Sequence, residues 1–255
     1  MSKKALMNNV YKNYIFDFYG TLVDILTDEK DPALWDKLAQ LYQAYGADYK
    51  GEGLKKSYAK RVAQTRKELI EIKGVAYPEV DLAHIFNQLY VDARPQSSNS
   101  SQPDDWGNLI AMVFRVLSRK QLLAYPHTKE VLTFLKEQGC RLYLLSNAQA
   151  AFTNAEIDLM ELRPYFDAIY LSSDVGICKP QPEFLKQVLD DHGLKPSDTV
   201  MVGNDLTTDI AVAEAVGIDG ILLNTFPYSR RELEKSPIKP DRVITDIEAL
   251  KTNFT

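Results

Sequence analysis

Apolar and polar positions follow two different patterns along this 255-residue chain. Near the start, the apolar run that includes Tyr14 ends at Asp17, and a short apolar run bounded by a turn is typical of a strand buried on both faces. From Pro32 onwards apolar residues recur at helical spacing, and Gly46 predicts where the first of these helices ends. We expect helices over about 32–45, 54–72, 80–93 and 106–117, with no strand among the last three.

After Pro126 the pattern becomes a regular alternation of helices and apolar strands. The expected strands lie near 141–145, 168–171, 199–202, 221–223 and 242–244, with helices at 128–139, up to about 160, 182–192 and 209–216. Such βαβ alternation is typical of a parallel sheet covered by helices, with right-handed crossovers. We therefore expect an α/β fold with a Rossmann-like parallel sheet core formed by residues 1–24 and 121–255, and a helical domain inserted at 25–120.

Composition narrows the choice of partners. With 45% apolar and 25% charged residues the chain is expected to fold, and a net charge of -5 with a pI near 5.3 provides no basic surface for nucleic acid or anionic lipid. No apolar run reaches the length of a membrane span, and Met1–Lys12 lacks the apolar core of a secretion signal. We therefore expect a cytoplasmic protein with a small soluble ligand, either a monomer or a homodimer.

The two cysteines and one polar tract are not expected to belong to the functional site. Cys140 and Cys178 are the only cysteines, and a reducing compartment makes a structural disulfide between them improbable. The polar, Ser- and Pro-rich tract Arg94–Pro103 lies between two expected helices and is predicted to form a mobile loop.

Polar residues gather after the expected strands, at the edge where open α/β sheets bind their ligands. They are Asp17 after the first strand, Ser146 and Asn147 after the second, Lys179 in the loop after the third, and Asn204, Asp205 and Asp209 after the fourth. A carboxylate that attacks a phosphoryl group needs a divalent cation, donors for the phosphoryl oxygens, and a positive charge such as a lysine. The sequence supplies each of these parts.

In the same order, four segments resemble the motifs of the haloacid dehalogenase (HAD) superfamily of hydrolases, and the resemblance covers nearly the whole chain. The segments are Asp17-Phe18-Tyr19-Gly20-Thr21, Ser146-Asn147, Lys179-Pro180 and Gly203-Asn204-Asp205-Leu206-Thr207-Thr208-Asp209. The resemblance implies that the helical insert is a cap domain that closes over the site.

The resemblance also implies roles for single residues. Asp17 is expected to be the nucleophile that forms a covalent aspartyl intermediate, and Lys179 to neutralise charge. The residues expected to bind the substrate are Gly20, Thr21, Ser146, Asn147 and Lys179. Mg²⁺ is the expected cofactor, because hard oxygen ligands suit that ion. Its expected ligands are Asp17, the backbone carbonyl of Tyr19, Asp205 and Asp209, with Asn204 as a weaker candidate.

Tyr19 departs from the phosphatase pattern. HAD phosphatases usually carry a second aspartate two residues after the nucleophile, where it acts as acid and base. A phenol is a poor base at neutral pH, and losing this assistance typically slows a reaction by about a hundred- to ten-thousand-fold. Tyrosine at this position resembles the 2-haloacid dehalogenases, whose halide leaving group needs no proton and whose reaction needs no metal.

The acids after the fourth strand favour the phosphatase. A metal-free dehalogenase has no use for Asp205 and Asp209 beside the nucleophile, because three unneutralised carboxylates would repel an anionic substrate. The favoured hypothesis is a Mg²⁺-dependent phosphatase of a small phosphorylated metabolite, slow or selective for good leaving groups because of Tyr19. The alternatives are a dehalogenase-type hydrolase and a binding or regulatory module that has lost turnover.

Overall fold

The computed structural model describes residues 11–94 and 104–254. The expectations for the start of the chain, Met1–Lys12, and for the tract Arg94–Pro103 fall almost wholly outside these residues. Among the described residues, no helix combines the length and the apolar character needed to cross a bilayer.

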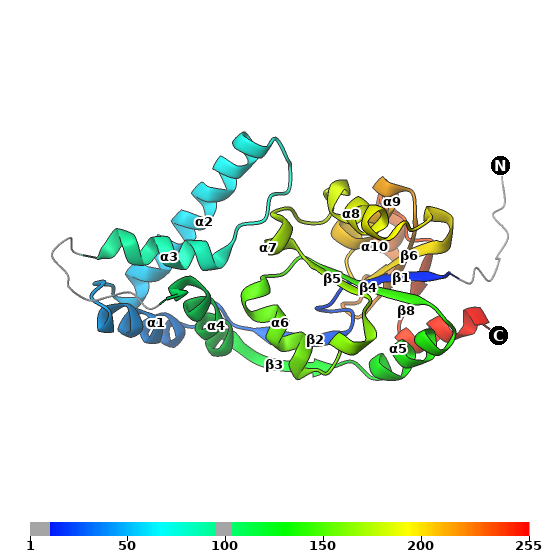
Figure 1. Ribbon diagram of the computed structural model, residues 1–255, viewed down its shortest axis with the longest axis horizontal. Helices are drawn as coiled ribbons and strands as arrows, with labels where there is room; N and C mark the ends of the chain where they lie inside the picture. Colours follow the sequence, from blue (N-terminus) through cyan, green and yellow to red (C-terminus); the bar gives the residue numbers. More distant parts are fainter. Residues whose placement is uncertain (1–10, 95–103, 255) are drawn as a thin grey trace.

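Within the described residues, six parallel strands form the main sheet in the order β5-β4-β1-β6-β7-β8 (Figure 1). They are β1 (Asn13–Phe16), β4 (Arg141–Ser146), β5 (Ala168–Leu171), β6 (Thr199–Gly203), β7 (Asp219–Leu223) and β8 (Arg242–Ile244). β1 pairs with β4 on one side and β6 on the other. The strand order reverses at β1, and ligands bind α/β sheets at such a switch point.

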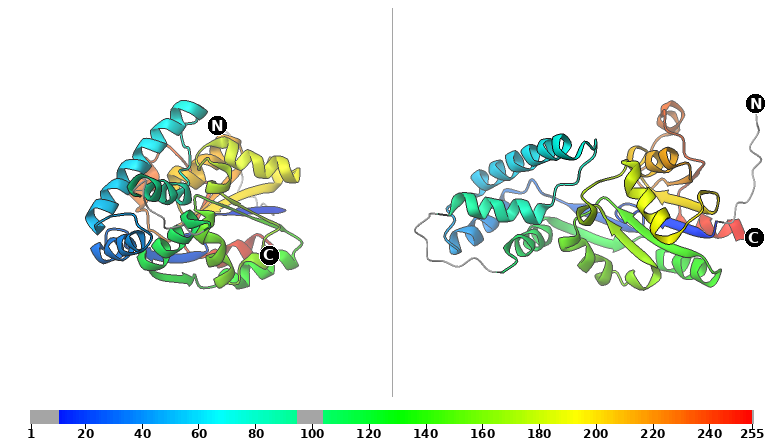
Figure 2. Two further views of the ribbon diagram at one scale, coloured as in Figure 1. Left: turned by 60° about the vertical axis from the view of Figure 1, so that its left-hand side comes forward. Right: turned by 45° about the horizontal axis from the view of Figure 1, so that its top comes forward.

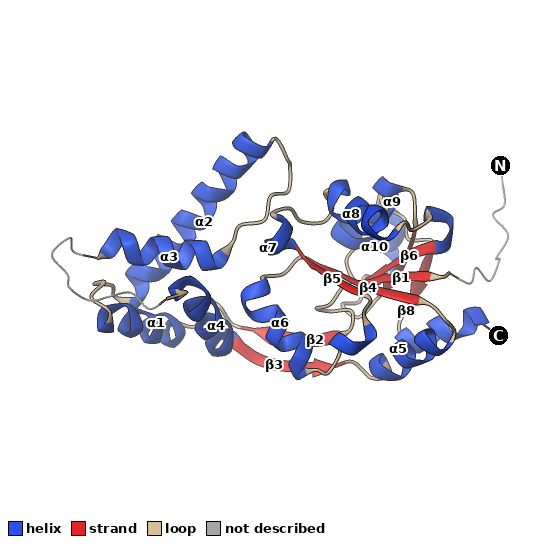
Figure 3. Ribbon diagram, in the orientation of Figure 1, coloured by secondary structure: helices blue, strands red, loops and turns tan. Residues whose placement is uncertain are grey.

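Helices cover both faces of this sheet (Figure 3). Tyr14 and Phe16 of β1 belong to an apolar cluster with α5 (Thr128–Glu137), whereas Ile15 packs on the other face in a cluster with α8 (Pro182–His192) and α9 (Ala211–Val216). Successive side chains of a strand point to opposite faces, so apolar residues at every position of β1 suit a strand buried on both sides. The predicted α/β fold is therefore confirmed, with a three-layer core.

The first four helices form a separate group at one end of the elongated molecule (Figures 1 and 2). They are α1 (Pro32–Ala44), α2 (Gly51–Lys73), α3 (Leu82–Ala93) and α4 (Trp106–Ser118). They pack around their own apolar cluster, in which Trp35, Phe86 and Phe114 make ring contacts. We call this group, residues 32–93 and 106–118, the helical unit.

An antiparallel ribbon of two strands, β2 (Val23–Thr27) and β3 (Arg119–Ala124), connects the helical unit to the sheet. The sequence pattern did not predict it, because both strands are short and β3 begins with the polar residues Arg119-Lys120-Gln121. The expected domain limits at residues 24 and 121 fall inside these two strands.

The remaining elements are helices and turns between and after the strands. They are α6 (Ala150–Leu159), α7 (Ser172–Val175), α10 (Arg230–Lys235), the 3₁₀ turns η1 (Arg163–Tyr165), η2 (Pro196–Asp198) and η4 (Ile247–Phe254), and the π-helical turn η3 (Leu206–Ile210). The helix expected at 209–216 therefore begins as a π-helical turn, a form often found at functional sites.

Candidate active site

Asp17 lies immediately after the central strand β1. Its backbone N–H donates to the Val202 carbonyl (3.0 Å), which continues the pairing with β6 by one residue. The residue is only 7% exposed, so its carboxylate is largely shielded from water. Buried carboxylates need partners, and four loops supply them.

Lys179 is the principal partner of Asp17. Its Nζ atom donates to Asp17 Oδ1, to Asp209 Oδ1 and to the Leu145 carbonyl, each at 2.7 Å. An ammonium group has three protons, so all three donors are used. Burial disfavours the ammonium, but Asp17 and Asp209 outweigh that effect and raise the pKa of Lys179, which keeps it charged.

The last residue of β4, Ser146, and the residue after it, Asn147, complete this side of the site. The Ser146 hydroxyl donates to Asp17 Oδ1 at 3.1 Å. Asn147 holds the backbone of Lys179 with both ends of its amide: Nδ2 donates to the Lys179 carbonyl (3.0 Å) and Oδ1 accepts from the Lys179 N–H (2.7 Å). In this structure Asn147 therefore orients Lys179.

The turn after Asp17 approaches the loop after β6 closely. Gly20 has a φ of +81°, a conformation that favours glycine, and a Cβ atom added to it would lie 2.5 Å from Asn204 Nδ2 and displace that side chain. The buried Thr21 hydroxyl lies 3.3 Å from Asp17 Oδ2 and 3.1 Å from Asn204 Oδ1. Its single proton is donated to one of them at a time.

The two acids of the last segment differ in their surroundings. Asp205 Oδ1 caps the following turn, accepting from the backbone N–H groups of Thr207 (2.6 Å) and Thr208 (3.0 Å). Asp209 points back to the site, where its Oδ2 accepts from the Asp205 N–H at 3.0 Å. Burial raises the pKa of the Asp209 carboxyl, and the Lys179 ammonium opposes that shift.

The oxygen donors around Asp17 fit a hard divalent cation. Asp17 Oδ2 and Asn204 Oδ1 converge on the same Thr21 hydroxyl, so a carboxylate oxygen and an amide oxygen lie close together. Within residues 11–94 and 104–254, no group of three or more His, Cys, Asp or Glu side chains is arranged to hold a metal. A metal at Asp17 would therefore also need amide or carbonyl oxygens, and Asn204 Oδ1 is one such oxygen close to Asp17.

Tyr19 turns its side chain away from this cluster of donors and towards α6. Its hydroxyl bonds to the Glu156 carboxylate and to the Thr153 hydroxyl (3.0 Å). Burial raises the pKa of the phenol, the neighbouring Glu156 carboxylate adds to the shift, and the Arg115 guanidinium, 4.9 Å from the ring centroid, opposes it. The phenol is therefore neutral at ordinary pH.

Glu156 connects Tyr19 to the junction between α4 and β3. It is 3% exposed and forms a two-point ion pair with Arg115 (2.9 and 3.1 Å), and Arg119 adds a contact of 2.9 Å. The sequence analysis missed this cluster. The available signal was an acid and an arginine on otherwise apolar helix faces, which a single sequence cannot pair.

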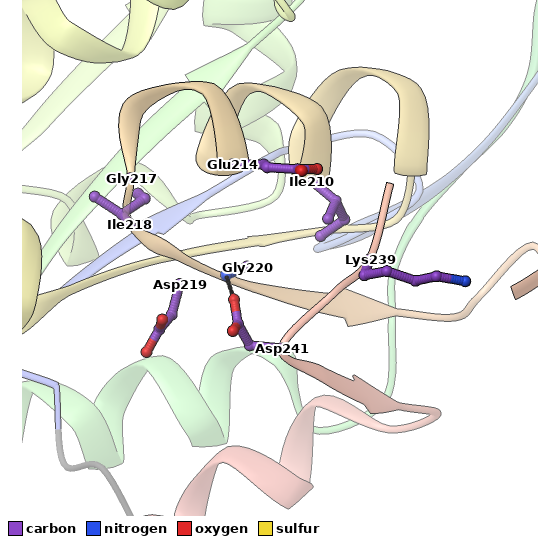
Figure 4. A pocket seen from close by; sticks show the side chains of 8 residues that line it. All are labelled: Ile210, Glu214, Gly217, Ile218, Asp219, Gly220, Lys239 and Asp241. Carbon is purple, nitrogen blue, oxygen red and sulfur yellow. Dashed lines mark hydrogen bonds between the residues drawn. The ribbon is translucent and has the colours of Figure 1, made fainter. Parts of the chain in front are cut away.

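A separate polar pocket lies at the opposite edge of the sheet (Figure 4). Its lining includes Asp219, the first residue of β7, and Asp241, which directly precedes β8. Asp17 follows the last residue of β1, and the strands are parallel, so Asp219 and Asp241 lie at the opposite strand ends from Asp17.

The comparison with known families agrees with this geometry. Residues 11–217 match the family described as haloacid dehalogenase-like hydrolase, and this range includes all four segments. The chain belongs to this family.

Curated proteins that match part of the chain include phosphatases of small metabolites. The chain is 33% identical over 132 residues to a glyceraldehyde 3-phosphate phosphatase from Methanothermobacter thermautotrophicus. The aligned region covers 51% of this chain and 58% of that protein. The chain therefore spans little more than half the length of this curated relative.

Two solved structures share the fold over nearly the full chain. A 2-haloacid dehalogenase from Pseudomonas syringae pv. Tomato DC3000 matches with a TM-score of 0.66 at 22% identity, covering 96% of this chain and 98% of that one. A HAD phosphatase from Thermococcus onnurineus matches with a TM-score of 0.62 at 19% identity, covering 95% and 97%. At these identities the likeness concerns the fold alone.

Proposed function

We propose that this protein is a Mg²⁺-dependent phosphatase of a small phosphorylated metabolite, with Asp17 as the nucleophile. The observation that carries the proposal is the placement of the Asp17 carboxylate against the Lys179 ammonium and the Ser146 hydroxyl at the end of the central strand. Curated relatives that match parts of the chain are named as phosphatases of small metabolites, which supports the same class.

In the proposed reaction Asp17 attacks the phosphorus atom of the substrate. A bond forms between the carboxylate oxygen and phosphorus, the bond to the leaving oxygen breaks, and water then hydrolyses the aspartyl phosphate to release inorganic phosphate. Ser146 binds the phosphoryl oxygens, and Lys179 neutralises their charge as it develops. The backbone N–H groups of Gly20 and Thr21 donate within their own turn, to the Val23 (2.8 Å) and Phe18 (3.3 Å) carbonyls, so these two residues shape the loop around the phosphoryl group. Asn147 keeps Lys179 in position.

The metal would reduce the repulsion between the Asp17 carboxylate and the anionic substrate. We propose that Asp17, the Tyr19 backbone carbonyl and the segment from Asn204 to Asp209 hold it. Asn204 Oδ1 is the best-placed side-chain oxygen of that segment, and Asp209 is the next. Asp205 would have to release the two N–H groups that it caps.

We further propose that the helical unit acts as a cap over the site and determines substrate selectivity. The ribbon formed by β2 and β3 carries the chain from the Asp17 turn to the helices and back. Tyr19, Arg115 and Glu156 connect that same turn to the base of the unit.

The contacts of Tyr19 favour a restricted range of substrates. The phenol donates to the Glu156 carboxylate and also contacts the Thr153 hydroxyl instead of standing free as an acid, which supports substrates whose leaving group needs no proton. The same observation keeps a 2-haloacid dehalogenase as the second candidate, since a halide also leaves without a proton. Loss of turnover, leaving a binding module, is the third.

One assay series separates the three candidates. Purified protein is incubated with p-nitrophenyl phosphate, with Mg²⁺ or with EDTA, and separately with 2-chloropropionate under halide detection. The phosphatase predicts phosphate release that requires Mg²⁺ and no halide. Halide release that persists in EDTA would establish the dehalogenase instead, and inactivity on both substrates would favour the binding module.

A further inference from the structure

A short segment of the chain between α2 and α3, Tyr77–Leu82, docks against the sheet domain. The Cys178 N–H donates to the Tyr77 carbonyl (2.8 Å), and the Glu79 N–H donates to the Gly176 carbonyl (3.2 Å). These bonds flank an antiparallel bridge between Pro78 and Ile177. The loop thus paired leads directly into Lys179.

Gln149 fixes the other end of this segment. Its Nε2 donates to the Val80 carbonyl (3.0 Å), and its Oε1 accepts from the Leu82 N–H (2.9 Å). Gln149 is 8% exposed, and both ends of its side-chain amide bond to the backbone of the helical unit. Gln149 follows Ser146 by three residues, so the same loop holds Asp17 and the segment Tyr77–Leu82.

Glu79 provides a third connection. Its carboxylate accepts from the Ser172 hydroxyl and from Cys178 Sγ (3.2 Å). Burial raises the pKa of the Cys178 thiol to about 12, and the Glu79 carboxylate adds to the shift, so the thiol remains a donor at neutral pH. The Ser172 hydroxyl also accepts from the Ala148 N–H (2.8 Å), so Glu79 is linked through Ser172 to the loop after β4.

We propose that Tyr77–Leu82 is a latch that holds the helical unit against the two loops carrying Ser146 and Lys179, and that Gln149 and Glu79 are its positioning residues. Closing the latch orders the loops that bind the transferring group. Binding at those loops therefore stabilises the closed latch, and by thermodynamic linkage opening the latch weakens binding by the same factor. This coupling rests on the proposed phosphatase function, whereas the latch itself does not.

Hydrogen exchange tests the latch without requiring activity. Exchange is followed by mass spectrometry on peptides that cover 77–82 and 176–178, in wild type, Gln149→Ala and Glu79→Ala. Each variant removes side-chain hydrogen bonds that hold the segment, so we expect these amides to exchange about tenfold faster while β4 and β6 keep their protection. Gln64→Ala is the matched control, because that exposed side chain donates to Glu68 on the same helix, away from the segment Tyr77–Leu82.

Two variants guard against failure to fold, which circular dichroism and thermal melting would reveal. If both variants fold and their latch amides exchange at the wild-type rate, the latch is overturned. Faster exchange spread evenly over β4 and β6 would also overturn it, because that result indicates general destabilisation.

Inorganic phosphate with Mg²⁺ tests the coupling. In wild type it should slow exchange of the latch amides by about tenfold, and in Gln149→Ala its dissociation constant should rise by a similar factor. An unchanged dissociation constant in a variant with a loosened latch would overturn the coupling. If wild type neither binds phosphate nor hydrolyses aryl phosphates, the proposed function and the coupling both fail, and the exchange rates of the variants still decide the latch.

Discussion

Lys179 and Asp17 show that a buried charge in this site needs a charged partner. Lys179 is 2% exposed and lies between two carboxylates, so its charge is compensated twice. Removing one member of a buried ion pair typically costs about 3–5 kcal/mol, because the remaining charge is left without a partner. The sequence predicted that both residues lie at the same edge of the sheet, whereas the contact of a second carboxylate, that of Asp209, with Lys179 required the structure.

Tyr19 is the residue whose role the sequence left most open. Its position marked it as a replacement for an acid, but the direction of its side chain depends on Glu156 and Arg115, which are far away in the chain. Local sequence carries no information about such a contact. In the structure the phenol connects the Asp17 turn to α6.

Replacing Tyr19 with phenylalanine tests this interpretation. We expect Tyr19→Phe to hydrolyse p-nitrophenyl phosphate within about threefold of the wild-type rate, since the hydroxyl is not needed as an acid. The lost hydrogen bonds should lower the free energy of unfolding by about 1 kcal/mol, and Glu156 keeps its pairs with Arg115 and Arg119. Steady-state kinetics and urea unfolding measure both effects. A rate reduced about a hundredfold would identify the phenol as the general acid.

At the scale of elements, hydrophobic periodicity predicted most helices and the strands of the main sheet. Helix α8 and strands β5 and β8 begin and end at the expected residues, because polar residues mark both ends of each apolar pattern. The ribbon of β2 and β3 was missed, since its strands pair across more than ninety residues and are partly exposed. The turn η3 was also missed, and it contains Asp209, whose contact with the distant Lys179 leaves no mark in the local pattern.

The junction between β6 and η3 permits a prediction about Gly203. A Cβ atom on this residue would lie 2.3 Å from Asp209 Cγ, so Gly203→Ala should displace the Asp209 carboxylate. We expect a loss of about 1–3 kcal/mol in the free energy of unfolding, and at least a tenfold drop in aryl phosphate hydrolysis.

Gly53→Ala is the control for this substitution. No atom lies within 4 Å of a Cβ at Gly53, which is on helix α2. The added methyl group should raise stability by roughly 0.5–1 kcal/mol and leave the rate unchanged. Equal activity of Gly203→Ala and Gly53→Ala would mean that the position of Asp209 does not matter for the reaction.

At the scale of the whole molecule, parallel topology explains why residues from distant parts of the chain meet. The carboxyl ends of β1, β4 and β6 share one edge, so residues that follow them are neighbours regardless of their separation in sequence. The sequence could therefore predict which loops meet. It could not predict how the helical unit is held, because the backbone contacts of Gln149 leave no pattern in the sequence.

Substituting Asp17 tests the central claim most directly. Asp17→Asn is compared with wild type and with Asp48→Asn, an exposed site in the helical part of the chain, by p-nitrophenyl phosphate hydrolysis with Mg²⁺ and with EDTA. An amide cannot replace the carboxylate as a nucleophile. We predict Mg²⁺-dependent hydrolysis in wild type and Asp48→Asn, and none above background in correctly folded Asp17→Asn. Hydrolysis retained in Asp17→Asn would contradict the assignment of Asp17 as the attacking group.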